Sequence, residues 1–431
     1  MMLIMKRITA LSACLALLLT ALGCGREAEN IGKTTLRWSA YAFPSYDKFR
    51  YEESAAFEKI HPEVRIKYEP ISGKNYAGKI MTQLAGGTAP DVFFVPPNLY
   101  WDFIKRGVLA DMTPYLDKDK EFIRQYYPAL TANVKYRGKI YGLVSNCSIP
   151  VLYYNKNIFD KMKMPYPTND MTLEEMVELA GKMTIRESNG KAKQYGLINA
   201  MGWQQLGILY GGQLWSKDGS KCNINSEPFK KGKKFTKDVY AAYKISPYPR
   251  EAQDMGSREQ FIGHRAAMYL GSTWEIATFK IQNRGAQKLN YGCVMAPVPK
   301  GGKRAYLAGG NILGVNAKSK NKKLAFELAR FMCGPESIKF LIGMGDSVPL
   351  RPEGEEMQFL LNNPTHSSDV AENIRKGMEY IIPYSSIFSS RVVPDQFEKT
   401  VKEEMDKYIL LNQDLDKTLK SIEVRISKAI K

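Results

Sequence analysis

Residues 64–97 read VRIKYEPISGKNYAGKIMTQLAGGTAPDVFFVPP and combine two strands and a helix in one short stretch. Residues 64–68 alternate apolar and charged or polar side chains, which predicts a half-buried strand. Apolar residues then recur at every fourth position over residues 76–84, and a glycine pair ends that predicted helix. Residues 91–95 read as a buried strand that two prolines stop. Strand, helix and strand in this order predict a parallel sheet with helices on its faces.

The same rhythm continues on both sides of this stretch. Residues 36–38 read as a short strand, and apolar positions between residues 49 and 60 recur at helical spacing. Thr172-Leu173-Glu174-Glu175 has the pattern of a capping box, which opens a helix. Further helices are predicted around residues 324–331, from Gly334-Pro335 onward, and over residues 397–426.

The first residues predict export. Lys6 and Arg7 precede an uncharged run, residues 8–22, that is rich in Leu and Ala. This run is shorter than the about 20 apolar residues of a membrane-spanning helix, and it fits a secretory signal peptide over residues 1–23. The alternative is a buried N-terminal helix, and Met5 is a second possible start of translation.

The signal ends in Ala21-Leu22-Gly23-Cys24, which resembles a bacterial lipobox, although Leu stands one place later than usual. We therefore expect Cys24 to be acylated and to anchor the protein to a membrane at the outer face of the cell or in the periplasm. Stable anchoring takes more than one acyl chain, which lipoprotein modification supplies. Residues 24–33 are polar without an apolar period and are predicted to be a tether.

The length and charge of the chain restrict its domain count and its partners. Without the signal, 408 of the 431 residues remain, which suits two domains. The net charge of +18 falls to +16, because the signal carries two basic residues and no acidic one. This basic character indicates either a solvated surface or attraction to an anionic ligand or envelope. Nucleic acid is not expected as a partner outside the cell.

The sequence lacks recognisable catalytic and metal-binding motifs. It has no GxSxG, P-loop, HExxH or GxGxxG pattern, and its three histidines are not at metal-ligand spacing, so neither an enzyme nor a cofactor is expected. A pair of glycosidase carboxylates can come from distant positions, so this class stays open as an alternative. Four cysteines remain beyond the signal and the lipid site, without a CxxC pattern, and a disulfide among them stays open: Cys147, Cys222, Cys293 and Cys333.

Aromatic residues in predicted loops are the features of the sequence that point to a ligand-binding site. Trp38 is followed by Ser39-Ala40-Tyr41 at a predicted strand end, where α/β folds place ligand loops. Trp203 and Trp274 lie in short segments without periodicity. An aromatic plane suits the apolar face of a sugar ring, and amide, carboxylate or guanidinium groups suit its hydroxyl rim. The alternative is that each Trp is an ordinary core or surface residue.

Several segments in a fixed order resemble the extracellular solute-binding proteins of ABC importers, the maltose-binding-protein-like sugar receptors. The resemblance runs from Leu36 to the C-terminus, with Val144 where the family has Pro and residues 169–171 where it has a Trp. The segments are AGGTAPDVF at 85–93, GKIYGL at 138–143 with LYYNK at 152–156, residues 167–184, RAAMYLGSTW at 265–274, and residues 296–325.

The resemblance implies an α/β, two-lobed periplasmic-binding-protein fold with a hinge and a ligand cleft between the lobes. The first lobe would combine residues 34–145 with 296–345, and the second 146–295 with 346–431. Lobes of this kind close around a ligand by hinge motion. The implied function is carbohydrate capture by a monomer that hands its ligand to the permease subunits of an ABC importer.

The ligand-binding residues that the resemblance suggests come from both lobes. Trp274 would stack under a sugar ring, and Asp91 would either bond a hydroxyl or cap its turn. Two glycines would let backbone N–H groups approach the ligand or form an ordinary turn, and Arg351 could hold hydroxyls or a carboxylate. The full set is Trp38, Tyr41, Asp91, Asn146, Trp203, Gln204, Trp274, Gly309, Gly310, Asn311 and Arg351.

Two other functions stay open. The same fold could bind an anionic sugar, a peptide, a polyamine or another small solute, and the positive charge together with Arg351 favours the anionic version. A polyamine receptor would need several cleft carboxylates, and only Asp91 is a candidate. A secreted glycoside-active enzyme is the third possibility, and turnover of a bound sugar would distinguish it.

Overall fold

The computed structural model describes residues 32–42, 44–199, 201–247, 255–282, 288–364, 366–388 and 394–430. The predicted signal peptide and Cys24 lie outside these ranges. The described chain divides into two compact units, the first formed by residues up to 93 with Lys318–Leu328 and the second by the rest. The expected lobes divide the chain at other positions and stay predictions.

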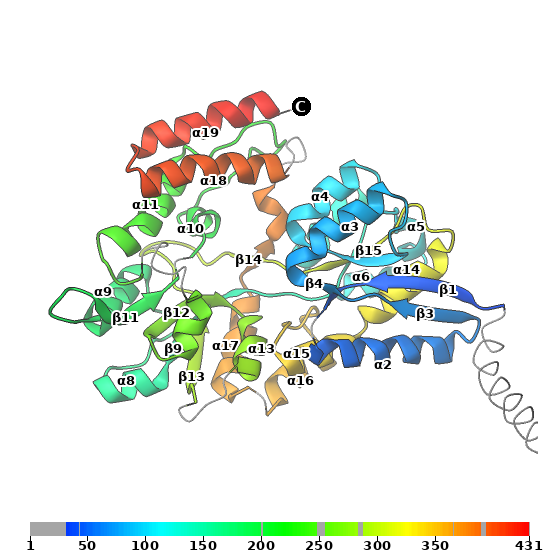
Figure 1. The fold of residues 1–431 in the computed structure, drawn as a ribbon, viewed down its shortest axis with the longest axis horizontal. Helices are drawn as coiled ribbons and strands as arrows, with labels where there is room; N and C mark the ends of the chain where they lie inside the picture. The colour runs from blue at the N-terminus through cyan, green and yellow to red at the C-terminus, as the bar shows by residue number, and fades with distance from the viewer. Residues whose placement is uncertain are drawn as a thin grey trace, which may run out of the picture. The chain divides into compact units, whose positions relative to one another are not determined.

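The first unit is built on parallel strands. Strand β1 (Thr34–Ser39) pairs with β3 (Val64–Tyr68) and with the first two residues of β5 (Val92–Val95), in each case in parallel. Side chains of β3 alternate between buried and exposed, as predicted, and α2 (Pro44–Ile60) packs along it. Figure 1 shows α2 and α3 (Tyr76–Ala85) on opposite sides of these strands. The remaining elements of this unit are β2 (Tyr41–Ala42), β4 (Ile71–Ser72) and η1 (Gly73–Asn75).

The second unit has a five-stranded sheet in the order β10-β11-β12-β9-β13. Strands β11 and β12 are parallel, whereas β9 runs antiparallel to both β12 and β13. Helix α9 packs against β11 and α17 against β13 (Figure 1). The sheet strands are β9 (Pro150–Asn155), β10 (Ile185–Arg186), β11 (Ala192–Ile198), β12 (Ala266–Ser272) and β13 (Tyr291–Met295).

The second unit also contains further helices and short strands, and β5 and α14 (Lys322–Met332) have residues in both units. The short strands are β6 (Lys135–Tyr136), β7 (Lys139–Ile140), β8 (Leu143–Val144), β14 (Tyr306–Ala308), β15 (Ile312–Val315) and β16 (Ile381–Pro383). The helices are α4 (Pro97–Lys105), α5 (Thr113–Leu116), α6 (Lys120–Arg124), α7 (Pro128–Asn133), α8 (Lys156–Met162), α9 (Leu173–Met183), α10 (Trp203–Leu209), α11 (Glu227–Ala241), α12 (Ser257–Ile262), α13 (Glu275–Gln282), α15 (Pro335–Met344), α16 (Glu355–Asn362), α17 (Ser368–Met378), η2 (Tyr384–Ile387), α18 (Pro394–Leu410) and α19 (Leu415–Ala429).

The predicted capping box at the start of α9 is confirmed. The Thr172 hydroxyl accepts a hydrogen bond from the Glu175 backbone N–H, and the Glu175 carboxylate accepts one from the Thr172 N–H. Both N–H groups would otherwise lack a partner at the helix end. The inner face of α9 packs into the core of the sheet, where Gly196 of β11 lies so close to Ala180 that no side chain fits.

The predicted helical C-terminus is present as two helices, α18 and α19, that pack together (Figure 1). Their apolar stripes form one core cluster with Trp215 and Phe229. Within the described ranges, none of the helices has the length and apolar composition needed to cross a membrane. Cys147, Cys222, Cys293 and Cys333, for which a disulfide was an open possibility, are all buried. Among the described residues none of them forms a disulfide.

One lysine is buried beside the core cluster that α18 and α19 form with Trp215 and Phe229. The Lys233 side chain of α11 is fully buried, its amine has no hydrogen-bond partner among the described residues, and its Nζ lies 3.7 Å from the centre of the Trp203 ring. Burial lowers the pKa of Lys233 from 10.5 to about 7, because the charged amine is poorly solvated there. The unfolded chain therefore binds more protons than the folded chain between about pH 7 and 10.5.

We expect Lys233→Met to stabilise the protein by roughly 2–4 kcal/mol near and below neutral pH, because the cost of burying the charge disappears. The gain should be largest below about pH 7, where the folded lysine is protonated, and should shrink as the pH rises toward 10.5. Denaturant unfolding at several pH values measures this. Lys231→Met, at an exposed position of the same helix, is the matched control. A gain in stability that does not vary with pH would contradict the lowered pKa of Lys233 in the folded protein.

Candidate functional site

One edge of the second unit's sheet gathers polar and aromatic side chains. Strands β11 and β12 end here at Ile198 and Ser272, and β9 begins here at Pro150. Carboxyl ends of parallel strands are where α/β folds place ligand sites. A pocket with a cavity volume of about 400 Å³ lies at this edge, and we call it the sheet-edge pocket. Its size is typical of a small-molecule site.

Trp274 is the exposed aromatic residue of the sheet-edge pocket. It lies in the turn between β12 and α13, and 38% of its surface is exposed. The preceding residue, Thr273, fixes this turn, because its backbone N–H donates to the Ile149 carbonyl at 3.0 Å and its hydroxyl accepts from the Ile149 N–H at 3.2 Å. Thr273 is itself buried, and the next side chain, Trp274, lines the pocket.

A buried carboxylate next to Trp274 organises this turn. Glu275 is 3% exposed, and its carboxylate accepts hydrogen bonds from the Arg258 guanidinium and from the Tyr269 hydroxyl, the latter at 2.8 Å. The guanidinium carbon of Arg258 lies 4.8 Å from the centre of the Trp274 ring. One arginine therefore neutralises the buried charge and also contacts the Trp274 ring through a cation–π interaction.

The protonation states of this group are fixed by their contacts. Burial lowers the pKa of Arg258, but the hydrogen bond and charge of Glu275 outweigh it, so the pKa is raised overall. Burial, followed by the charge of Glu275, raises the pKa of the Tyr269 hydroxyl. Arg258 thus stays charged and Tyr269 stays neutral at physiological pH.

The other walls of the sheet-edge pocket come from distant segments. Gln204 and Gln205 near the start of α10 both border it, and the Gln205 side chain is also bonded to the backbone of Ala305 and Leu307. Asn199 donates from its amide to the Leu270 carbonyl at 2.8 Å. Glu275 is the only charged residue among the described residues that line the pocket.

Gly309 lines the sheet-edge pocket, and Gly310 lies beside it. Gly309 pairs with Ser148 through two backbone hydrogen bonds, and a side chain there would press on the Tyr384 ring at 3.3 Å. At Gly310, an added Cβ would lie 1.9 Å from the Asn146 carbonyl oxygen. Only glycine fits so close an approach, so the packing of the chain explains Gly310.

Asn146 and Asn311, both predicted ligand contacts, contact each other. The Asn146 side-chain oxygen accepts from the Asn311 N–H at 2.6 Å, and its amide donates to Asp346 at 3.4 Å. Neither residue is among those that line the sheet-edge pocket. Their hydrogen bonds hold neighbouring segments of the second unit together.

Arg351, the predicted anion contact, is 5% exposed and ion-paired with the buried carboxylate of Glu356. It also donates to the Cys333 carbonyl at 3.2 Å and lies over the Tyr126 ring. Burial raises the pKa of Glu356, and the Arg351 charge opposes that rise. In this structure Arg351 therefore has a structural partner and lies outside the sheet-edge pocket.

Trp203 is the first residue of α10 rather than part of a loop. Its ring packs against Phe229 and under the Lys233 amine. The residues on either side, Gly202 and Gln204, line the sheet-edge pocket, but Trp203 itself is not among the lining residues.

The three predicted contacts of the first unit have structural partners. Trp38 has no exposed surface, stacks on Tyr68 at 4.4 Å between ring centres, and donates from its indole to the Ser54 hydroxyl. Trp38 is the residue before the last one of β1, and in this structure its ring faces the core.

Asp91 accepts hydrogen bonds from the Arg37 N–H at 2.9 Å and the Ser319 hydroxyl at 2.6 Å. These bonds match the turn-capping alternative. Tyr41 is half-buried against the Tyr76 ring, and burial raises its pKa to about 12.

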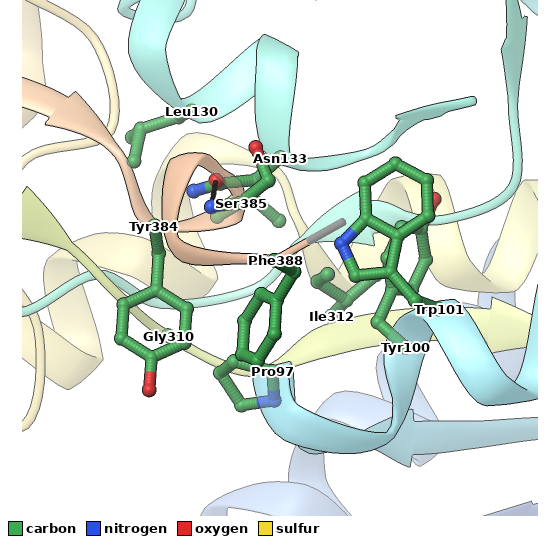
Figure 2. Close-up of a pocket in the computed structure, with 11 residues that line it drawn as sticks. Pro97, Tyr100, Trp101, Leu130, Asn133, Gly310, Ile312, Tyr384, Ser385 and Phe388 are labelled. Atoms are coloured by element: carbon green, nitrogen blue, oxygen red, sulfur yellow. Dashed lines mark hydrogen bonds between the residues drawn. The ribbon is translucent and has the colours of Figure 1, made fainter. Parts of the chain in front are cut away.

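A second, much smaller cavity lies within the same unit, and we call it the aromatic pocket (Figure 2). Its volume is about 20 Å³, enough for one water molecule. Aromatic side chains dominate its walls: Tyr100, Trp101, Tyr384 and Phe388. Among the described residues, no cluster of His, Cys, Asp or Glu suitable for a metal ion is found here or elsewhere.

The sequence of residues 44–339 matches the family of bacterial extracellular solute-binding proteins, and the chain belongs to this family. The match covers more than half of the chain and includes the pocket-lining segments around residues 199–205 and 269–275. As a member of an extracellular family, the protein is exported.

Curated relatives align over most of the chain. The galactooligosaccharide-binding protein of Bacillus subtilis (strain 168) is 28% identical over 354 residues, which cover 78% of each chain. The arabinooligosaccharide-binding protein of the same organism is 24% identical over 346 residues, with 77% of each chain covered.

Solved structures define the fold as the two-lobed α/β binding-protein fold. An ABC substrate-binding protein from Listeria monocytogenes in complex with cycloalternan has a TM-score of 0.78, with 25% identity over 92% of this chain and 98% of that one. The sugar-binding protein MalE from Xanthomonas citri has a TM-score of 0.74 and 20% identity, with coverage of 92% and 97%.

We expect Glu275→Gln to destabilise the protein by about 1–3 kcal/mol, because Arg258 loses its buried counter-charge. Glu259→Gln should cost less than about 0.5 kcal/mol, because Glu259 is an exposed and more distant partner of the same arginine. Denaturant unfolding of both variants measures the difference. Equal effects would show that Glu275 does not hold Arg258.

Proposed function

We propose that this protein captures a neutral carbohydrate outside the cytoplasm and delivers it to the permease of an ABC importer. The observation that carries the proposal is the exposed Trp274 ring in a pocket of about 400 Å³ whose other walls are mainly uncharged. An aromatic face packs against the apolar face of a sugar ring, and amide and backbone groups suit its hydroxyls.

The relatives support this ligand class. Those named above are described as galactooligosaccharide- and arabinooligosaccharide-binding proteins, and the Listeria protein was solved in complex with cycloalternan. The Listeria protein is an ABC substrate-binding protein, which supports delivery to a permease of that type. Capture by hinge closure is part of the proposal.

The charges near the pocket favour a neutral ligand over an anionic one. Glu275 is the charged residue among the described pocket lining, and Arg258 neutralises it, so this lining offers a carboxylate or phosphate no net positive charge. Arg258 is already paired with Glu275, and Arg351 is buried with Glu356 outside the pocket. Neither arginine therefore offers an unpaired positive charge to an anionic ligand.

The same geometry supports a binding protein rather than an enzyme. Glycoside hydrolysis uses two carboxyl groups on opposite sides of the bond. The described lining of the sheet-edge pocket contributes one, Glu275, and its oxygens are already bonded to Arg258 and Tyr269. We therefore propose binding without turnover.

We further propose that Cys24 carries a lipid anchor. The lipobox-like sequence motivates this, and a relative from Streptococcus pneumoniae (strain ATCC BAA-255 / R6) is described as a solute-binding lipoprotein. A monomer tethered by residues 24–33 would present its ligand close to a membrane permease.

Isothermal titration calorimetry against neutral and acidic sugars tests the proposed ligand class. We expect a neutral sugar to bind, and Trp274→Ala to weaken its affinity about tenfold or more, because the stacking face is lost. Trp274→Phe should keep most of the affinity, and Tyr243→Ala, at an exposed position outside the pocket lining, should leave it unchanged. Binding of a non-sugar solute alone would reject the proposal.

A further inference from the structure

Tyr384 forms part of the wall of both cavities. It lines the sheet-edge pocket together with Ile387, and it lines the aromatic pocket together with Ser385 and Phe388. All four residues belong to η2 or follow it directly. One short element therefore borders both cavities, and the Tyr384 side chain is the part that they share.

The backbone that carries Tyr384 is fixed at both ends. The Ser385 N–H donates to the Asn133 side-chain oxygen at 2.9 Å (Figure 2). The Asn133 amide in turn donates to the Ala308 carbonyl at 3.0 Å. At the other end, the Trp215 indole donates to the Ile387 carbonyl at 3.0 Å. These bonds hold η2 in place, so the cavities can join only if the Tyr384 side chain changes.

The Tyr384 ring is packed on two sides. One side lies against Gly309, where the absence of a Cβ leaves room for it, with 3.3 Å to the ring. On another side lies the Phe388 ring, at 5.5 Å between centres and in an edge-to-face arrangement, as Figure 2 shows. Gly309 borders the sheet-edge pocket and Phe388 the aromatic pocket, so the ring stands between surfaces of the two cavities.

The aromatic pocket has walls suited to a sugar ring but no space for one. Trp101 and Phe388 are only partly buried, and the Tyr100 hydroxyl is already bonded to the Val134 carbonyl at 2.6 Å. The volume of about 20 Å³ accommodates one water molecule. With Tyr384 in place, a ligand in the sheet-edge pocket therefore cannot extend past it toward Trp101.

We propose that Tyr384 sets the length of the captured oligosaccharide by closing the sheet-edge pocket on the side of Trp101. This inference rests on the proposed function. The ligand class it implies is a short neutral saccharide whose end meets the Tyr384 ring. Replacing that ring by a small side chain would join the cavities and expose Trp101 and Phe388 as an additional stacking site.

The test measures affinities of the wild type and Tyr384→Ala for ladders of linear gluco- and galactooligosaccharides, from the monosaccharide upward. We expect Tyr384→Ala to shift the affinity ratio of longer to shorter members by about tenfold in favour of the longer, since one more ring stacks on an aromatic face. Tyr384→Phe keeps the ring and should keep the wild-type profile. Tyr384→Val provides a smaller change if the alanine variant does not fold.

A wild type that binds the ladder, with an unchanged profile in the alanine and valine variants, would overturn the inference and leave the proposed function intact. If the wild type binds no member of these ladders, the wider panel of neutral and acidic sugars decides the proposed function, and a crystal structure of the small variant decides the role of Tyr384. A continuous cavity from Trp274 to Trp101 would support it. Collapse of Phe388 into the vacated space would overturn it.

Discussion

The buried carboxylate of Glu275 imposes the constraint on which the site depends. A carboxylate with 3% exposure needs a counter-charge and hydrogen-bond donors, and Arg258 and Tyr269 supply them. The ion pair with Arg258 and the hydrogen bond from Tyr269 fix Glu275 at the start of α13. Arg258 in turn contacts one face of Trp274. The aromatic surface offered to a ligand is thus positioned by an ion pair that the ligand does not need to touch.

Much of the fold could be predicted from the sequence, because local patterns carry it. The alternation of residues 64–68 and the capping box at Thr172 and Glu175 depend on neighbours in sequence, and the structure contains both as predicted. The division into lobes could not be derived in this way, because it depends on which distant segments pack together. It followed from the family resemblance and stays a prediction.

The site was only partly predictable, and the three loop tryptophans show why. Each lies near a break in periodicity, yet only Trp274 is exposed in the pocket, whereas Trp38 lies in the core and Trp203 begins a helix. Periodicity in the sequence cannot tell whether one face or both faces of a strand are buried by the rest of the chain. Glu275 and Tyr384 were missed because they are about a hundred residues apart and share no motif.

A crystal structure with a neutral oligosaccharide bound would show whether Trp274 is the stacking surface. We expect a sugar ring stacked on the face of Trp274 opposite Arg258, with the Arg258–Glu275 pair intact and no contact to Arg351. A ligand bound away from Trp274, or an acidic ligand paired with Arg258 or Arg351, would contradict it.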